Sequence, residues 1–384
     1  MRVTAGRRVL GAAAVCCALL APAAARANSA VIATLSAETP ISAGHGWLVW
    51  SVPSAGGWAL EGFHHGRLAT LPVATRPQPF DAQVGTDAGG APVVTYSRCR
   101  VAPAMEDEGL YVKGTGTLAR PNTGTGCRLR VLELDSGRER SPPVPEPSGV
   151  SDTTPAMWRG TLVFARKDTG HGRVSQIMLS RPGDRSRLLA LPHGAVPEGC
   201  PHEQGCREFP PGGEVQALSI DAQIVAFVWK PEGPGVGIDG AWEERVDSLA
   251  GHRGVLAGSP IGSESCTDGE QDPVEEEWPA PPILSSSAAL FPELERGGCY
   301  TTFTAALFQY REGNRRLGTA SVPIVELARD GASTYGLVAE RPTTEQDPGC
   351  SATLPCALER ITPPPLRPTH YKPTHPFDGR AGER

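Results

Sequence analysis

The stretch Arg159-Gly-Thr-Leu-Val-Phe-Ala165 places a short apolar run directly after a turn, and the same pattern recurs along the chain. Each copy opens on Gly or Asp and continues into β-branched or aromatic residues. A run of this kind, bounded by turn residues, is typical of a buried β-strand of about five to seven residues. The other copies are residues 44–51, 89–97, 221–229 and 330–338.

A second pattern follows the first and consists of a strand, a polar turn and a shorter strand. Its turns include Asp135-Ser-Gly137, Pro182-Gly-Asp184 and Glu312-Gly-Asn314, whose residues accept the positive φ of hairpin turns. The copies are residues 60–72, 132–138, 177–189 and 308–317. The two patterns together predict a four-stranded antiparallel sheet, and sheets of this kind repeated around an axis form a β-propeller.

The repeats therefore predict an all-β fold, with 45 Gly and 38 Pro among 384 residues arguing against a helical bundle. We expect a β-propeller over residues 28–362, with six blades of four antiparallel strands, although seven blades also fit. A pair of β-sandwiches is the alternative architecture, because its turns recur at similar intervals. The six expected units are 31–73, 79–145, 150–193, 214–260, 283–323 and 324–362.

One unit carries a family resemblance. Residues 151–166, followed by 175–180, resemble the WD40-like (PD40) repeat of TolB-type propellers, with Pro155, Trp158, Gly160, Val163 and Phe164 in the repeat's positions. Arg159 departs from it, because the family often has Pro-Asp there. The resemblance implies a six-bladed fold, Trp and Phe packing between blades, and an extracytoplasmic role. It implies no catalytic residues.

Residues 1–27 have the features of a secretion signal peptide. Three arginines precede an apolar run over residues 9–20, which is too short to span a bilayer, and Ala25-Arg-Ala27 matches a cleavage site. An uncleaved anchor and a twin-arginine signal at Arg7-Arg8 are the alternatives. We expect a secreted or extracytoplasmic monomer, cleaved near Ala27, without an integral membrane span.

The charge of the exported chain excludes several partners. Removal of residues 1–27 takes away four arginines and no acids, which leaves 32 basic and 42 acidic residues and a net charge of −10. This balance argues against nucleic acid and against docking to anionic lipid. Residues 363–384 are rich in proline and are expected to form a disordered tail, in which His370, Tyr371 and His375 lie exposed.

The exported chain keeps an even number of cysteines, which behind a signal peptide predicts disulfides. We favour the sequential pairing, since each pair then closes a local loop. A zinc site using His202 is the rival explanation of the second pair, but a second pair of ligands is missing nearby. The candidate pairs are Cys99–Cys127, Cys200–Cys206, Cys266–Cys299 and Cys350–Cys356.

No sequence motif assigns a chemistry. The chain has no G-x-S-x-G elbow, H-E-x-x-H, P-loop or dinucleotide-binding motif. The acidic run 268–277 offers oxygens for Ca²⁺ but fails the EF-hand pattern, so we interpret it as a solvated loop. His64-His65 is interpreted as a surface turn and not a metal pair. Glu243, Glu244 and Asp247 near Trp229 offer paired carboxylates, as glycosidases use, but nothing in their spacing places them in a cleft.

The sequence thus predicts no catalytic, cofactor-binding or metal-binding residue. We expect a non-catalytic binding or scaffolding module for an extracellular protein or a cell-envelope component, because propellers present loops on a rigid scaffold. The alternative is a glycan-directed hydrolase or lyase. Its acids would come from separate blades and converge on the propeller channel, where they would leave no local motif.

Overall fold

The computed structural model is all-β in the part of the chain that it describes. That part comprises residues 31–37, 39–100, 125–145, 147–168, 175–190, 213–222, 224–231, 241–248, 253–260, 275–279, 283–285, 288–297, 303–310, 314–320, 324–339 and 350–361. Within these ranges, no helix is long and apolar enough to cross a membrane.

The first three sheets each consist of four consecutive antiparallel strands. The strands of the first sheet are β2 (Ile41–Gly44), β3 (Trp47–Ser54), β4 (Gly57–His64) and β5 (Arg67–Thr70). Those of the second sheet are β6 (Gln83–Thr86), β7 (Pro92–Arg98), β8 (Arg128–Glu133) and β9 (Glu139–Arg140). Those of the third sheet are β10 (Val150–Trp158), β11 (Thr161–Asp168), β12 (Ser175–Ser180) and β13 (Arg187–Ala190).

The fourth sheet repeats this order. The fifth sheet has a fifth strand, and the sixth sheet includes β1 from the beginning of the chain. The fourth sheet contains β14 (Gly213–Ile220), β15 (Ile224–Pro231), β16 (Ala241–Ser248) and β17 (Arg253–Pro260). In the fifth sheet, β18 (Glu275–Pro279) and β19 (Ile283–Ser285) both pair with β20 (Ala288–Gly297), which is followed by β21 (Phe303–Tyr310) and β22 (Asn314–Ala320). The sixth sheet contains β23 (Ile324–Asp330), β24 (Ser333–Val338), β25 (Cys356–Ile361) and β1 (Val31–Leu35).

Two-residue turns join several of these hairpins. His45-Gly46, His65-Gly66 and Arg159-Gly160 each have positive φ at both positions. That geometry is the type I′ turn, whose twist matches the right-handed twist of the flanking strands. His and Arg here occupy the position that Asn or Asp usually takes, so the following Gly is the residue that allows the turn.

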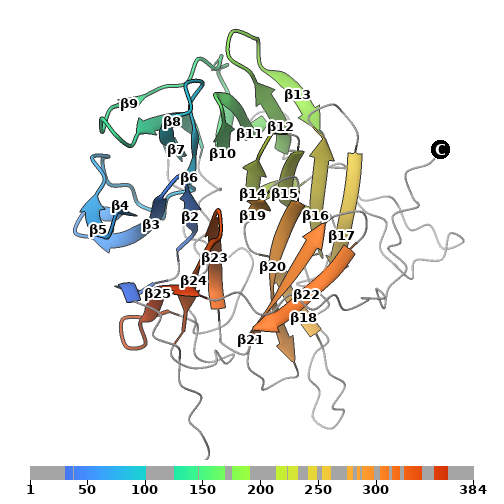
Figure 1. Ribbon diagram of the computed structural model, residues 1–384. Coiled ribbons are helices and arrows are strands. Elements are labelled where there is room, and N and C mark those ends of the chain that lie inside the picture. The colour runs from blue at the N-terminus through green and yellow to red at the C-terminus, as the bar shows by residue number, and fades with distance from the viewer. Residues whose placement is uncertain are drawn as a thin grey trace, which may run out of the picture.

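The sheets stand around a common axis (Figure 1). The strand nearest the axis in each sheet contacts its counterpart in the next sheet, in the order β2, β6, β10, β14, β19 and β23, and β23 contacts β2 again. The described strands therefore form a closed ring, which is the arrangement of a β-propeller. Two β-sandwiches are excluded, since a sandwich sheet packs on one face only.

The hydrophobic core is divided into layers between neighbouring sheets. On β11, Leu162 and Phe164 pack with the second sheet, whereas Val163 and Ala165 pack with the fourth. Because both faces of a sheet are buried, its second strand is a continuous apolar run instead of an alternating one. This confirms the buried strands predicted from the turn-plus-apolar pattern, which correspond to β3, β7, β11, β15 and β24.

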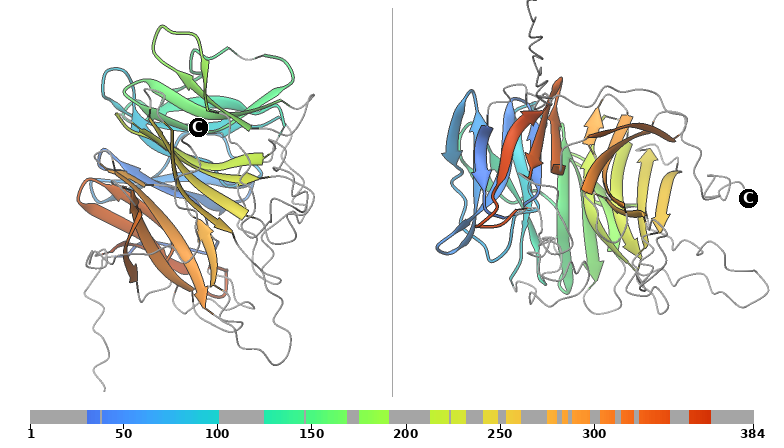
Figure 2. Two further views of the ribbon diagram at one scale, coloured as in Figure 1. Left: turned by 90° about the vertical axis from the view of Figure 1, so that its right-hand side faces the viewer. Right: turned by 90° about the horizontal axis from the view of Figure 1, so that it is seen from below.

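The ring closes between distant parts of the chain. Strand β1 pairs antiparallel with β25, from Leu35 opposite Cys356 to Val31 opposite Glu359. Figure 2 shows the red C-terminal strands beside the blue N-terminal ones. The first expected unit is wrong in this respect, because residues 31–35 belong to the sixth sheet and the first sheet begins at Ile41. The fifth unit likewise begins earlier than expected, at Glu275.

Disulfides join Cys99 to Cys127 and Cys350 to Cys356, which are two of the four sequential pairs. The first encloses residues 100–126, and the second ends at the first residue of β25. Cys350 and Cys356 are buried in the layer between the sixth and first sheets. Cys200, Cys206, Cys266 and Cys299 lie outside the described residues, as do His202, residues 1–27 with the expected signal peptide, and residues 363–384 with the expected tail.

A buried carboxylate ties the second sheet to the third. Asp81 Oδ1 accepts hydrogen bonds from Ser97 N at 2.8 Å and Arg76 Nη1 at 3.2 Å. Its Oδ2 accepts from Ser97 Oγ at 2.6 Å and Thr154 N at 2.9 Å. Thr154 has a φ of 46°, which is unusual for a β-branched residue, and it lies at a bulge of β10. The bond from Asp81 helps to hold this strained backbone in place.

Prediction at the inner ring. Gly85 of β6 lies so close to β10 that a Cβ there would be 2.0 Å from the carbonyl oxygen of Met157. We expect Gly85→Ala to lower the free energy of unfolding by about 2–3 kcal/mol, because a backbone atom cannot move aside as a side chain can. Urea unfolding followed by circular dichroism measures this. Gly89→Ala is the matched control, since its Cβ would meet only the side chain of Asp87 at 3.3 Å. Equal stability of the two variants would contradict the close approach.

Prediction at the ring closure. Replacing both Cys350 and Cys356 by Ser should cost about 2 kcal/mol, and the same change at Cys99 and Cys127 about 3.5 kcal/mol, because the second loop is longer. The first change should also reduce hydrogen-exchange protection of the β25 amides, and the second should leave these amides protected. Loss of β25 protection in both variants, or in neither, would contradict a local role of the Cys350–Cys356 bridge.

Candidate functional site

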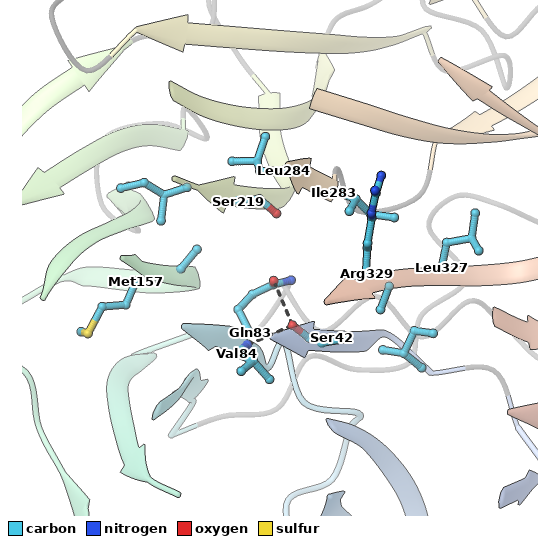
Figure 3. Close-up of a pocket in the computed structure, with 14 residues that line it drawn as sticks. Ser42, Gln83, Val84, Met157, Ser219, Ile283, Leu284, Leu327 and Arg329 are labelled. Atoms are coloured by element: carbon cyan, nitrogen blue, oxygen red, sulfur yellow. Dashed lines mark hydrogen bonds between the residues drawn. The ribbon is translucent and has the colours of Figure 1, made fainter. Parts of the chain in front are cut away.

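A cavity lies on the ring axis, with a volume of about 110 Å³. All six axis-facing strands contribute to it, so the cavity is a product of ring closure. The residues that line it are Ile41, Ser42 and Ala43 of β2, Gln83 and Val84 of β6, Ala156 and Met157 of β10, Ser219 and Ile220 of β14, Ile283 and Leu284 of β19, and Leu327, Ala328 and Arg329 of β23. Figure 3 shows the labelled side chains around this space.

Ser42 links the first two sheets at the cavity wall. Its Oγ accepts a hydrogen bond from Val84 N at 2.9 Å and donates one to Gln83 Oε1 at 3.3 Å. Both bonds are drawn in Figure 3. They fix the Gln83 side chain with its carbonyl oxygen toward Ser42, and the amide nitrogen is left on the cavity side.

Arg329 supplies the one charged side chain among the described lining residues. It is the penultimate residue of β23, and its Nε donates to Gly331 O at 2.8 Å in the turn that follows. This bond holds the guanidinium at one place beside Ile283, across the cavity from Gln83 (Figure 3). Arg329 is partly buried, so its charge is not fully solvated.

The rim next to Arg329 is tied across the point of ring closure. Asp330 Oδ2 accepts a hydrogen bond from Gly46 N at 2.6 Å, which joins the β23–β24 turn to the β2–β3 turn. The Asp330 carboxylate is thereby directed to the first sheet and is not part of the cavity lining. Among the described lining residues there is neither a carboxylate nor an imidazole.

The acidic residues predicted from the sequence lie elsewhere. Glu243, Glu244 and Asp247 are on β16, the third strand of the fourth sheet, two strands away from the axis. Glu243 is opposite Trp229 in the strand register. Of the acidic run 268–277, residues 275–277 belong to β18, and the remainder lies outside the described residues, as do His370, Tyr371 and His375.

The rings of His64 and His65 lie closer together than expected for adjacent residues of a strand, which point to opposite faces of the sheet. His64 ends β4 and stacks on Trp47, with ring centroids 4.2 Å apart and an interplanar angle of 8°. The His65 ring lies 3.9 Å from that of His64, because His65 has a φ of 48° and has already left the strand. The described residues contain no group of three or more His, Cys, Asp or Glu side chains that could hold a metal ion.

The PD40-like positions have structural roles. Phe164 is fully buried between the second and third sheets, and the carbonyl of Pro155 accepts a hydrogen bond from Thr95 Oγ1 at 2.9 Å. Trp158 is only half-buried and carries the guanidinium of Arg159 5.2 Å above its ring. Trp158 therefore reaches the surface next to the ring axis, in contrast to the expectation that it packs between blades.

Sequence reasoning missed Gln83 and Arg329. Each axis-facing strand contributes only two or three residues to the cavity. The local signal was a polar residue within the strand that precedes each turn-plus-apolar run, as in Arg329-Asp330-Gly331. Nothing in that signal indicates that residues from six separate segments meet.

No protein-family model and no curated protein matches the sequence. Among solved structures, the chain is similar to TolB from Acinetobacter baumannii at 10% identity and a TM-score of 0.42, covering 82% of this chain and 63% of that one. A puromycin-hydrolyzing peptidase from Mycobacterium tuberculosis has 11% identity and a TM-score of 0.44, with 90% and 54% covered. The chain thus spans less than two thirds of either structure. An endo-arabinanase from Bacillus licheniformis has 10% identity and a TM-score of 0.35, with 73% and 97% covered.

Prediction for His64. Partial burial, together with the neighbouring His65, lowers the pKa of His64 below 6.5, against the opposing effect of Asp135. The unfolded chain therefore takes up the proton first as the pH falls. The resulting stability is present above pH 6.5 and is lost as the pH falls through the folded pKa. An NMR titration should place His64 below 6.5, and the stability difference between the protein and His64→Gln should shrink over the same pH range. A titration above 6.5 would contradict the effect of burial.

Proposed function

We propose that the chain is a secreted, monomeric six-bladed β-propeller that binds an extracellular protein or cell-envelope component without catalysing a reaction. The propeller covers residues 28–362 after removal of the signal peptide, and the proline-rich tail over 363–384 follows it. The partner docks on the face of the ring where the axial cavity opens between the turns of the first two strands of each sheet.

The blade count is supported by the closed cycle of contacts from β2 through β6, β10, β14, β19 and β23 back to β2. A seventh blade would have to interrupt this cycle. Secretion is supported by the two disulfides, because such bonds persist in oxidising compartments outside the cytoplasm.

The observation that carries the choice of binding over hydrolysis is the described lining of the axial cavity. A glycosidase needs two carboxyl groups about 5–10 Å apart on either side of the scissile bond. The described lining offers Ser42, Gln83, Ser219 and Arg329 as its polar side chains. Ser42 is engaged by Gln83 and Val84, and the described lining contains no imidazole, so this lining supports recognition and not nucleophilic chemistry.

The docking face also has a distinctive exposed cation. Arg159 lies two residues after the lining residue Met157, in an exposed turn of positive φ, with its guanidinium over Trp158. An aromatic ring and an arginine together are the residue types enriched at protein interfaces. Arg67 is a suitable counterpart, because it is exposed on β5, the strand of the first sheet farthest from the axis.

Prediction for partner capture. The purified exported chain, cross-linked in extract of its own cell envelope and in culture medium, should capture one dominant, saturable protein partner identified by mass spectrometry. Arg159→Glu should reduce the capture by about tenfold or more, as expected for loss of an interface arginine. Arg67→Glu introduces the same charge change at the outer edge and should leave the capture unchanged.

Two results would overturn the proposal. One is the absence of any saturable protein or envelope component in both extracts. The other is release of reducing sugar from envelope or extracellular polysaccharides by the purified chain, which would favour the glycan-directed hydrolase or lyase. Equal loss of capture in both charge variants would contradict a specific role of Arg159 in the interface. Thermal unfolding of both variants verifies that they fold.

A further inference from the structure

The polar side chains of the axial cavity present an excess of hydrogen-bond donors. Arg329 uses Nε for Gly331 O, and its two Nη groups form no hydrogen bond with the described residues. Gln83 uses Oε1 as acceptor for Ser42 Oγ, and its Nε2 likewise has no acceptor among the described residues. The side chain of Ser42 is satisfied by one donated and one accepted bond. The unpaired groups of Gln83 and Arg329 are therefore all N–H donors.

The described lining also carries a positive charge, and this charge favours an anion as the excess of hydrogen-bond donors does. Arg329 is the one charged residue of the described lining, and the adjacent carboxylate of Asp330 is engaged by Gly46 N across the rim. The two Nη groups of Arg329 are therefore available to an anion. Planar guanidinium donors match the two oxygens of a carboxylate, and charge-assisted bonds of this kind are the strong ones.

Most of the remaining lining residues have aliphatic side chains. Ile41 and Val84 lie beside Ser42 and Gln83, and Ile283, Leu284 and Leu327 lie near Arg329. A cavity of about 110 Å³ is of the same order as the cavity of about 150 Å³ that binds benzene, so it has room for a ligand of a few heavy atoms. The aliphatic side chains of the wall favour a ligand with a short apolar body.

We propose that the axial cavity binds a small carboxylate that carries an apolar body, with the carboxylate held between Arg329 and Gln83. The guanidinium supplies the charge and the Gln83 amide supplies a neutral donor from the other side of the ring. The apolar body lies against the aliphatic side chains of β2, β6, β19 and β23. This site goes beyond the proposed docking of a macromolecular partner, and each can be absent without the other.

The test uses the purified exported chain and hexanoate as the probe, with binding followed by saturation-transfer NMR and calorimetry. Hexanamide lacks the charge, and acetate lacks the apolar body. Inorganic phosphate is an anion that has neither a carboxylate group nor an apolar body. We expect hexanoate to bind saturably and more tightly than each of the other three. Arg329→Gln should weaken hexanoate binding by about 10- to 100-fold, which is the effect of removing one charged hydrogen-bonding partner.

A second variant replaces Gln83 of β6 by glutamate, which has nearly the same side-chain volume. Gln83→Glu retains the acceptor for Ser42 Oγ, removes the amide donor and adds a negative charge, so it should also weaken hexanoate binding at least tenfold. Arg67→Gln, on the outer edge strand β5, is the matched control and should bind hexanoate as the unaltered protein does. Circular dichroism and thermal unfolding verify the fold of each variant.

The outcomes separate clearly. Hexanamide binding as tightly as hexanoate, or unchanged binding in Arg329→Gln, would overturn the role of the anion. Phosphate or acetate binding as tightly as hexanoate would overturn the role of the apolar body. Absence of hexanoate binding would overturn the site altogether, and partner capture would still test the proposed docking function independently.

Discussion

The structure depends on one antiparallel ladder, in which β1 pairs with β25. An open array of sheets would end in an unpaired edge strand and an exposed apolar face. Here the N-terminal strand supplies the outermost strand of the last sheet, and this pairing draws the sixth sheet against the first. The buried layer between these two sheets contains residues of both ends of the chain, including Leu35, Trp50 and Leu358. Because such contacts join residues far apart in sequence, closing them carries a large loop-entropy cost, which the apolar layer offsets.

Neighbouring sheets are held in register by polar ties as well as by apolar packing. Asp81 accepts four hydrogen bonds, one of them from β10 of the next sheet, so its charge is fully compensated. Asp152 and Arg166 face each other on β10 and β11 of the third sheet and form a second pair, with Nε to Oδ1 at 2.7 Å and Nη2 to Oδ2 at 2.8 Å. Pairs of this kind add little net stability compared with apolar residues of the same volume, but loss of one partner leaves a buried charge. We infer that the bonds of Asp81 define the relative position of the second and third sheets more than they add to the free energy of unfolding.

The axial cavity follows from this arrangement. At the axis, β6 and β10 approach so closely that Gly85 has no room for a side chain beside Met157. Gln83 and Arg329 are the longest polar side chains among the described lining residues. Their positions are fixed by bonds to Ser42 and Gly331, so the donors are ordered before any ligand arrives. Such preorganisation lowers the entropy cost of binding.

The local patterns of the sequence determined the strand-forming segments and their turns. The run Leu162-Val-Phe-Ala165 is apolar throughout because both faces of its sheet are buried, and Gly160 marks the type I′ turn before it. Only the tertiary structure decided that residues 31–35 belong to the last sheet, since backbone pairing at a sheet edge leaves no side-chain signature. Only the tertiary structure brought Gln83 and Arg329 to one cavity, because ring closure sets which strands face each other across the axis. Sequence periodicity reports the burial of each strand against its neighbours, and the position of a strand around the ring depends on contacts between segments remote in the chain.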